Sequence, residues 1–275
     1  MKTSEKLLLA AGAALVGTAA ATVFLAAPGR STAAQRMPFM GQNLAHRGLH
    51  NLEKKAPENS LAAFRTAAQA GYGVELDVRL TRDGQVVVSH DDALARMTYT
   101  YKNVSESDYA EIRQLQLLGT EEYVPLFTEV LDILVPAEVP VVVEVKACKN
   151  WKALCEKTLE ILDGYEGKFC VESFDPRIVA WWRFNAPDIL RGQLTSQYED
   201  LRGNRFLAWM SSCCLMNFMG RPHFIAHHIG RKAWTVRLAE AMGAMRVAWT
   251  AKNRDSETGH DAVIFEDFTP PVRYK

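Results

Sequence analysis

From residue 43 onward the chain alternates short β-branched runs with longer helical stretches, and this alternation limits its fold more than any other feature. Such alternation is typical of a parallel α/β sheet or barrel. The expected strands are residues 43–46, 74–79, 86–90, 139–146, 169–173, 189–193, 224–228, 246–250 and 262–265. The expected helices are residues 60–70, 106–116, 128–134, 152–162, 177–184, 207–219 and 232–242. No Gly/Ser-rich linker interrupts this region, so we expect a single domain over residues 37–275.

Nine strands are one more than a simple eight-stranded barrel needs. The segment Arg82-Asp83-Gly84-Gln85 offers an explanation, because Asp-Gly between two alternating runs is a hairpin signal. If Asp83 and Gly84 form a two-residue turn, residue 82 pairs with residue 85. Asp77 then pairs with His90, and we expect these two side chains to face each other on one side of the hairpin.

The first 36 residues differ from the rest of the chain. Residues 7–27 form a run of 21 residues without a charge, which as a helix spans roughly 30 Å, about the thickness of a bilayer core. We therefore expect residues 1–36 to form a single-pass membrane anchor. The alternative is a secretory signal cleaved near Ser31-Thr32-Ala33 or Thr32-Ala33-Ala34, although the apolar region of such signals is usually shorter. Basic residues on both sides of the run leave its orientation undetermined.

Charge and cysteine content exclude several classes of protein. The 32 basic and 32 acidic side chains cancel, whereas a general nucleic-acid binder has a basic excess. None of the five cysteines has the CxxC or Cys/His spacing of a zinc site. We therefore expect no nucleic-acid partner and no structural zinc.

Polar side chains occur at the ends of several expected strands. Glu75 and Asp77 share one face of a strand, as do Glu144 and Lys146 on another. His46 and Arg47 follow a third strand, and His90 ends a fourth. These positions also suit exposed edge strands with surface ion pairs, but the same placement recurs four times. Since barrel active sites gather at the carboxyl ends of strands, we interpret these residues as one site.

The chemistry of these side chains suggests a cation and an anionic substrate. Converging carboxylates without cysteine favour a hard divalent cation, Mg²⁺ or Ca²⁺, with Mn²⁺ as a further candidate. Arginine, lysine and a cation together suit a phosphate ester, whose oxygens they polarise. Two histidines with ordinary pKa values near 6.5 suit proton transfer at neutral pH.

An ordered set of motifs resembles the glycerophosphodiester phosphodiesterase family. The motifs are His46-Arg47-Gly48, Pro57-Glu58-Asn59-Ser60, Glu75-Leu76-Asp77-Val78, Thr81-Arg82-Asp83-Gly84, His90-Asp91, Glu144-Val145-Lys146, Glu172-Ser173-Phe174-Asp175 and Trp249-Thr250. The resemblance covers residues 43–270 and implies a TIM-type (β/α)8 barrel. It also implies hydrolysis of glycerophosphodiesters to sn-glycerol 3-phosphate and an alcohol.

The resemblance also implies roles for individual residues. Glu75, Asp77 and Glu144 match the metal ligands of the family. His46 and His90 match its catalytic acid/base pair, and Arg47 and Lys146 match the positive groups around the phosphate. Phe174 and Trp249 match the aromatic lining of the substrate pocket, although ordinary core packing is the alternative.

Two further segments are considered beside these motifs. We expect Asn59 to cap the helix that begins near residue 60, with Glu58 beside it at the helix start; the alternative is that Glu58 contacts the site. The C-terminal segment Phe265-Glu266-Asp267 departs from the Thr-Asp-x-Pro pattern that is usual in the family. This departure concerns the choice of substrate more than the chemistry.

The most consistent interpretation is a metal-dependent phosphodiesterase that acts on a glycerophosphodiester or lysolipid, with His46 as base and His90 as acid. One alternative is a lysophospholipase D- or phospholipase C-like hydrolase of membrane lipid headgroups. Another is a non-catalytic, membrane-tethered protein that binds phosphodiesters. The aromatic and Met-rich residues 207–219 suit either a helix on the barrel wall or a face that rests on lipid.

Overall fold

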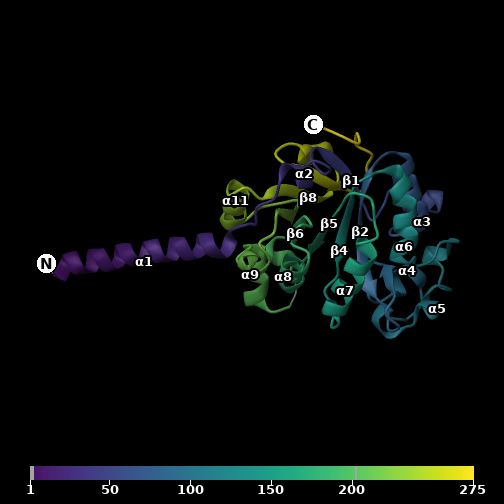
Figure 1. The fold of residues 1–275 in the computed structure, drawn as a ribbon, viewed down its shortest axis with the longest axis horizontal. Coiled ribbons are helices and arrows are strands. Elements are labelled where there is room, and N and C mark those ends of the chain that lie inside the picture. The colour runs from purple at the N-terminus through teal and green to yellow at the C-terminus, as the bar shows by residue number, and fades with distance from the viewer. Residues whose placement is uncertain (1–2, 202) are drawn as a thin grey trace.

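The computed structural model describes residues 3–201 and 203–275, and within them eight parallel strands close into a barrel (Figure 1). These strands are β1 Gln42–His46, β2 Gly73–Leu80, β4 Val141–Val145, β5 Phe169–Ser173, β6 Arg191–Thr195, β7 Phe224–His228, β8 Met245–Ala251 and β9 Ala262–Phe265. Pairing of β1 with both β2 and β9 closes the ring. The predicted TIM-type barrel is therefore confirmed.

Helices cover the outside of the barrel. They are α2 Ala33–Arg36, α3 Leu61–Gln69, α6 Phe127–Leu134, α7 Trp151–Leu162, α8 Pro176–Asn185, α9 Arg205–Ser212, α10 Asn217–Gly220 and α11 Trp234–Ala241. The single helix expected at residues 207–219 is in fact α9 and α10, and Cys214 between them has a left-handed φ of 52°. The helix expected at residues 106–116 is wrong in length. That region has only the short α5 Tyr109–Ile112 between two 3-10 turns.

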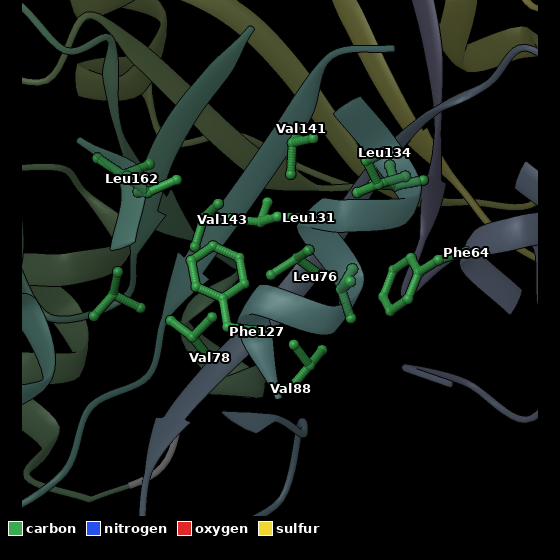
Figure 2. Packing of buried hydrophobic residues seen from close by; sticks show 14 of the residues in the cluster. Phe64, Leu76, Val78, Val88, Phe127, Leu131, Leu134, Val141, Val143 and Leu162 are labelled. Carbon is green, nitrogen blue, oxygen red and sulfur yellow. The ribbon is translucent and has the colours of Figure 1, made fainter. Parts of the chain in front are cut away.

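Alternation along the strands separates the core from the site. Val141, Val143 and Val145 of β4 point outward and pack with helix residues such as Phe64 and Phe127 (Figure 2). The intervening residues of the same strand point into the barrel, where Val142 joins a second apolar cluster. Because side chains alternate with a period of two, the outward packing of the valines directs Glu144 into the barrel.

The extra strand is a hairpin partner, as expected, but its predicted register is wrong by one residue. β3 Val86–Val88 runs antiparallel to β2 and pairs Val78 with Val88, so Asp77 lies opposite Ser89 and not His90. The turn is one residue longer than a two-residue turn, since Thr81 N–H bonds to Gln85 O across residues 82–84. Gly84 has a left-handed φ of 81°, as three-residue hairpin loops with a bulge require.

The N-terminal helix α1 Thr3–Ala26 extends away from the barrel (Figure 1). Much of the expected transmembrane run, residues 7–15, lies outside the residues whose side chains the structure describes. In the described part of the chain, no helix has the length and apolar character needed to cross a membrane, so the structure does not support the transmembrane expectation. The base of α1 is fixed to α10, because Asn217 donates a hydrogen bond to the Ala26 carbonyl at 2.9 Å.

The hairpin turn leads to a prediction about stability. Gly84→Ala should lower the free energy of unfolding by about 1 kcal/mol, because alanine is strained at a left-handed φ. A Cβ at position 84 would meet no atom within 4 Å, so the cost is one of backbone conformation alone. Gly164→Ala is the matched control, since its φ is ordinary and its Cβ would sit 3.7 Å from the Ile161 carbonyl oxygen. Urea unfolding followed by circular dichroism measures both variants, and equal stabilities would contradict this turn geometry.

Candidate active site

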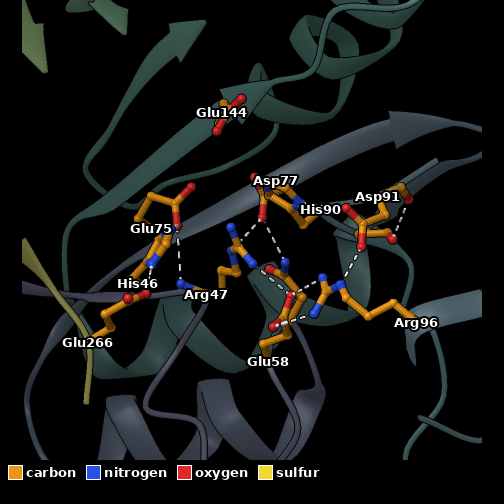
Figure 3. A network of polar contacts seen from close by, with 12 residues as sticks. His46, Arg47, Glu58, Glu75, Asp77, His90, Asp91, Arg96, Glu144 and Glu266 are labelled. Carbon is orange, nitrogen blue, oxygen red and sulfur yellow. Dashed lines mark hydrogen bonds and ion pairs between the residues drawn. The ribbon is translucent and has the colours of Figure 1, made fainter. Parts of the chain in front are cut away.

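Three buried carboxylates meet at the mouth of the barrel (Figure 3). Glu75 and Asp77 lie on β2 and Glu144 lies on β4, where the strand register places Asp77 beside Glu144. One oxygen from each of the three side chains lies within 4.8 Å of the others. The structure thus brings together the three predicted metal ligands.

Basic side chains partly neutralise these carboxylates. Lys146 is buried, and its Nζ lies 2.7 Å from Asp77 Oδ1 and 2.8 Å from Glu144 Oε1. Arg47 Nε lies 3.5 Å from Asp77 Oδ2, and the Arg47 backbone N–H donates to Glu75 Oε2 at 3.1 Å. Burial alone would raise the pKa of Asp77, but Lys146, His90 and Arg47 outweigh burial and hold this pKa below its usual value. Asp77 is therefore the member of the cluster whose ionised form is most favoured.

The pKa values of the other two carboxylates, Glu75 and Glu144, are shifted upward. Burial raises the pKa of Glu75 well above its usual value, and the nearby charges of Asp77 and Glu144 raise it further. The pKa of Glu144 is also raised, mainly by burial, although Lys146 opposes the shift. Buried carboxylates that repel one another are stabilised by a cation. The all-oxygen donor set fits a hard divalent ion, because Mg²⁺ and Ca²⁺ prefer carboxylate ligands.

His46 ends β1 and is held by a carboxylate from the far end of the chain. Its Nδ1 lies 2.7 Å from Glu266 Oε2, and its Nε2 lies 3.8 Å from Glu75 Oε2. The hydrogen bond to His46 lowers the pKa of Glu266 to about 2, so this carboxylate is ionised at neutral pH. With Nδ1 engaged, Nε2 is the ring nitrogen that faces the carboxylate cluster. In the sequence, Glu266 stands out only as a departure from the family pattern.

His90 lies after the hairpin on the opposite side of the mouth and is more exposed than His46. Its Nδ1 lies 2.8 Å from Asp91 Oδ1, and Arg96 Nε donates to the other oxygen of Asp91 at 2.6 Å. Arg96 belongs to α4 Ala95–Thr98 in the segment inserted after β3. Burial lowers the pKa of His90, and the positive charges of Lys146 and Arg47 lower it further against the opposing effect of Asp77.

Glu58 and Asn59 belong to the site and not to the start of the helix, which corrects two expectations. Glu58 joins the two sides of the mouth, because it accepts hydrogen bonds from Arg47 Nη1 at 2.8 Å and from both terminal nitrogens of Arg96. Asn59 has a left-handed φ of 56°, and its Nδ2 donates to Asp77 Oδ2 at 2.8 Å. Ser60 caps α3 in its place, accepting from the Ala63 N–H.

Phe174 and Trp249 meet on the β5–β8 side of the mouth. Their rings pack edge to face with centroids 5.8 Å apart, and Trp249 Nε1 donates to the Thr195 carbonyl at 3.1 Å. The ring of His228 lies 4.6 Å from Trp249. Both aromatic residues also pack against the interior apolar cluster, so each is part lining and part core. Their role in binding substrate stays a prediction.

Glu172 is a fourth buried acid, to which the sequence analysis assigned no role. The strand register places it beside Glu144, and its Oε2 finds no hydrogen-bond partner among the described residues. Burial raises the pKa of Glu172 well above its usual value, and the charge of Glu144 adds to the shift. The burial of Glu172 therefore disfavours its ionised form. The motif Glu172-Ser173-Phe174-Asp175, which begins near the end of β5, was the sequence signal that could have identified Glu172 as a site residue.

The fold and the site together define a class of protein. An eight-stranded α/β barrel carries, at the carboxyl ends of its strands, a cation-binding set of carboxylates between two histidines and two basic groups. This arrangement of side chains is typical of an enzyme that hydrolyses an anionic ester with the help of a metal ion.

Comparison with known proteins identifies the family. Residues 46–267 match the glycerophosphoryl diester phosphodiesterase family, so the chain belongs to this family of phosphoric diester hydrolases. The uncharacterized protein YqiK of Bacillus subtilis is 32% identical over 167 residues, which are 57% of this chain and 68% of that protein. The predicted family is therefore confirmed.

Two further relatives have descriptive names. The glycerophosphodiester phosphodiesterase of Caldanaerobacter subterraneus subsp. tengcongensis is 32% identical over 142 residues, 48% of this chain and 57% of that protein. Lysophospholipase D GDPD1 of Rattus norvegicus is 33% identical over 147 residues, 48% of this chain and 44% of that protein. The matched segment thus spans about half the length of each relative.

Solved structures share the fold. An Oleispira antarctica phosphodiesterase in complex with the product sn-glycerol-3-phosphate aligns with a TM-score of 0.67 at 24% identity, covering 82% of this chain and 93% of that chain. A glycerophosphodiester phosphodiesterase from Thermotoga maritima aligns with a TM-score of 0.61 at 24% identity, covering 81% of this chain and 92% of that chain. At this level of identity the comparison supports the barrel architecture.

The contact between His46 and Glu266 leads to a prediction about catalysis. Glu266→Gln should lower kcat by about 10- to 100-fold with little change in KM, because the carboxylate orients the ring and does not itself bind substrate. Asp267→Asn is the matched control, since Asp267 is the exposed neighbour and pairs with Lys252. Steady-state kinetics on a soluble phosphodiester measures both variants. Equal activity of the two variants, or a loss confined to KM, would show that Glu266 does not position His46.

Proposed function

We propose that the chain hydrolyses glycerophosphodiesters to sn-glycerol 3-phosphate and an alcohol, with one bound divalent cation. The observation that supports this most strongly is the cluster of Glu75, Asp77 and Glu144 beside Lys146 and Arg47. The names of relatives add support, because one is called a glycerophosphodiester phosphodiesterase and a solved structure holds the product sn-glycerol-3-phosphate.

The carboxylates and basic residues of the site would bind the cation and the phosphate, whereas the two histidines would transfer protons. Glu75, Asp77 and Glu144 would hold Mg²⁺, Ca²⁺ or Mn²⁺, and the bound ion would polarise the phosphoryl oxygens. Arg47 and Lys146 are the positive groups nearest the carboxylates, and they attract the phosphate anion to the mouth. Phe174 and Trp249 offer an apolar wall for the carbon skeleton of the substrate.

The two histidines have different roles in proton transfer, His46 as the base and His90 as the acid. Nε2 of His46 takes the proton of the attacking oxygen, since Glu266 fixes the ring and stabilises the imidazolium that forms. His90 gives a proton to the leaving alkoxide. Its lowered pKa makes its protonated form a stronger acid, and a phosphate anion at the mouth opposes this shift and favours the protonated form.

A second candidate substrate is a lysophospholipid, which the lysophospholipase D activity named for mammalian relatives suggests. Both candidates require the same bond cleavage and differ in the group attached to the glycerol. Turnover of glycerophosphocholine against lysophosphatidylcholine, with and without divalent metal, distinguishes them. A protein that binds either compound but hydrolyses neither would be a binding protein.

We also propose that residues 1–36 anchor the barrel domain, residues 37–275, to a membrane. The support is the run at residues 7–27, which carries no charged side chain. Cleavage of this segment and secretion of the barrel is the alternative. The mass of the mature protein and its distribution between membrane and soluble fractions distinguish the two.

The metal assignment predicts that EDTA abolishes activity and that Mg²⁺, Mn²⁺ or Ca²⁺ restores it. Glu75→Gln and Asp77→Asn should each lower metal affinity and turnover together, by about 100-fold or more in turnover, because each removes a ligand. Because the pKa values of Glu75 and Glu144 are raised, protons compete with the cation for these two ligands, so metal affinity should increase as pH rises. Calorimetric titration and kinetics check all three effects.

The control for these variants is Glu160→Gln, an exposed acid on α7 that pairs with Lys157. It should leave both metal affinity and turnover unchanged. Full activity of the wild type after exhaustive chelation would overturn the metal assignment.

The histidine assignment predicts an effect that depends on the leaving group. His46→Ala and His90→Ala should each lose about 10²- to 10⁴-fold in turnover of a substrate with an alkyl leaving group. On a p-nitrophenyl ester His90→Ala should lose much less, because this leaving group departs without a proton. His260→Ala is the control, since His260 precedes β9 at the end of the barrel away from the mouth. Equal losses on both substrates would remove His90 from the acid role.

A further inference from the structure

Exposed apolar side chains gather on one sector of the barrel wall. On α8, α9 and α11 five large apolar or aromatic side chains are each between 47% and 72% exposed. They are Phe184, Phe206, Leu207, Trp209 and Trp234, and we call this set the α8–α11 face. Exposed apolar side chains on the outer helices of one sector are typical of a surface that contacts a partner molecule or a membrane.

Helix α9 contributes three of the five residues and is amphipathic. Ala208 and Ser212 are buried toward the barrel, and the Ser211 carbonyl accepts a hydrogen bond from Thr195 Oγ1 at 2.9 Å. Phe206 and Trp209 lie on the outer side with ring centroids 6.0 Å apart. An inner face fixed to the barrel leaves these rings directed outward, which is the arrangement of an interfacial helix rich in Trp, Phe and Leu.

The helix α1 leaves the molecule from this same sector (Figure 1). Its last turn packs on α10, where Phe24 stacks with Phe218 at 6.1 Å. Arg221 then locks the base of the helix by donating to the carbonyls of Phe24 and Ala27 at 2.8 and 2.9 Å. Arg183 of α8 donates to the Phe218 and Met219 carbonyls, so α10 connects the base of α1 to α8, one of the helices of the face.

The sector is also the basic part of a neutral chain. Residues 176–243 include nine Lys and Arg but only four Asp and Glu, whereas the whole chain has 32 of each. Two arginines adjoin exposed aromatic residues of the face. The Arg183 guanidinium lies 5.0 Å from the ring centroid of Phe184, and Arg205 begins α9 next to Phe206. Basic groups around exposed aromatic rings complement a surface that is apolar inside and anionic outside.

We propose that the α8–α11 face lies on the surface of an anionic lipid bilayer. The aromatic rings enter the headgroup region and the arginines pair with lipid phosphates. The proposal does not depend on the hydrolytic activity, and it shares with the proposed anchor only the direction in which α1 leaves the barrel. The docked face borders the rim of the mouth, because Thr195 at the end of β6 holds both α9 and Trp249.

Quenching of tryptophan fluorescence by brominated lipid tests the proposal on the full chain. The protein is reconstituted into vesicles of phosphatidylcholine with phosphatidylglycerol in which the acyl chains carry bromine near the headgroups. Trp209→Phe and Trp234→Phe are compared with Trp151→Phe, whose indole is partly buried at the start of α7 and packs against the main core cluster. Each change keeps an aromatic ring, and circular dichroism verifies that each variant folds.

The expected result is a lower quenched fraction for Trp209→Phe and Trp234→Phe than for wild type, with Trp151→Phe equal to or above wild type. Quenching should also decrease when phosphatidylglycerol is omitted. Two results would overturn the proposal: equal quenching in wild type and Trp209→Phe, and a stable dimer in detergent with Trp209 shielded from a soluble quencher. Failure to associate with vesicles would overturn both this proposal and the anchor. Association without any Trp209 effect would overturn the docking face alone.

Discussion

The barrel forces three carboxylates of the active site so close together that they repel one another. Closing the strands brings Glu75, Asp77 and Glu144 into one buried space, where unpaired carboxylates cost several kcal/mol each. Lys146 and Arg47 offset part of this cost, and they keep only Asp77 below its usual pKa. The remaining imbalance raises the pKa of the other two acids and gives a divalent cation a strong electrostatic advantage. The metal binding, phosphate attraction and pH response that we propose all derive from this arrangement.

The same strands hold the repulsive site in place. On β2 and β4 the outward-facing valines and leucine pack against α3 and α6, and each intervening residue is thereby directed inward. A strand with this pattern has one register that packs its outward apolar side chains against the helices, since a slip of one residue would turn its acidic side chains toward that apolar layer. The apolar half of each strand therefore fixes the orientation of the acidic half.

This coupling explains which parts of the molecule the sequence could predict. The barrel and its carboxylate cluster follow from short-range alternation, and both were predicted. The hairpin register failed by one residue because turn length depends on a single backbone conformation at Gly84. Glu266 and Asn59 were misjudged because their partners, His46 and Asp77, lie far away in sequence, 220 and 18 residues respectively. Contacts of that kind are set by the closed barrel and have no local pattern.

The two histidines are held in unequal ways, and the difference agrees with their proposed roles. His46 is buried at the end of a barrel strand and is clamped by Glu266, whose low pKa keeps a negative charge beside the ring. A base benefits from this environment, because the charge stabilises the imidazolium formed by proton uptake. His90 is on the inserted segment after β3 and shares its partner Asp91 with Arg96, so less negative charge reaches its ring. An acid benefits from weaker stabilisation of its protonated form, because the proton is then released more readily to the leaving oxygen.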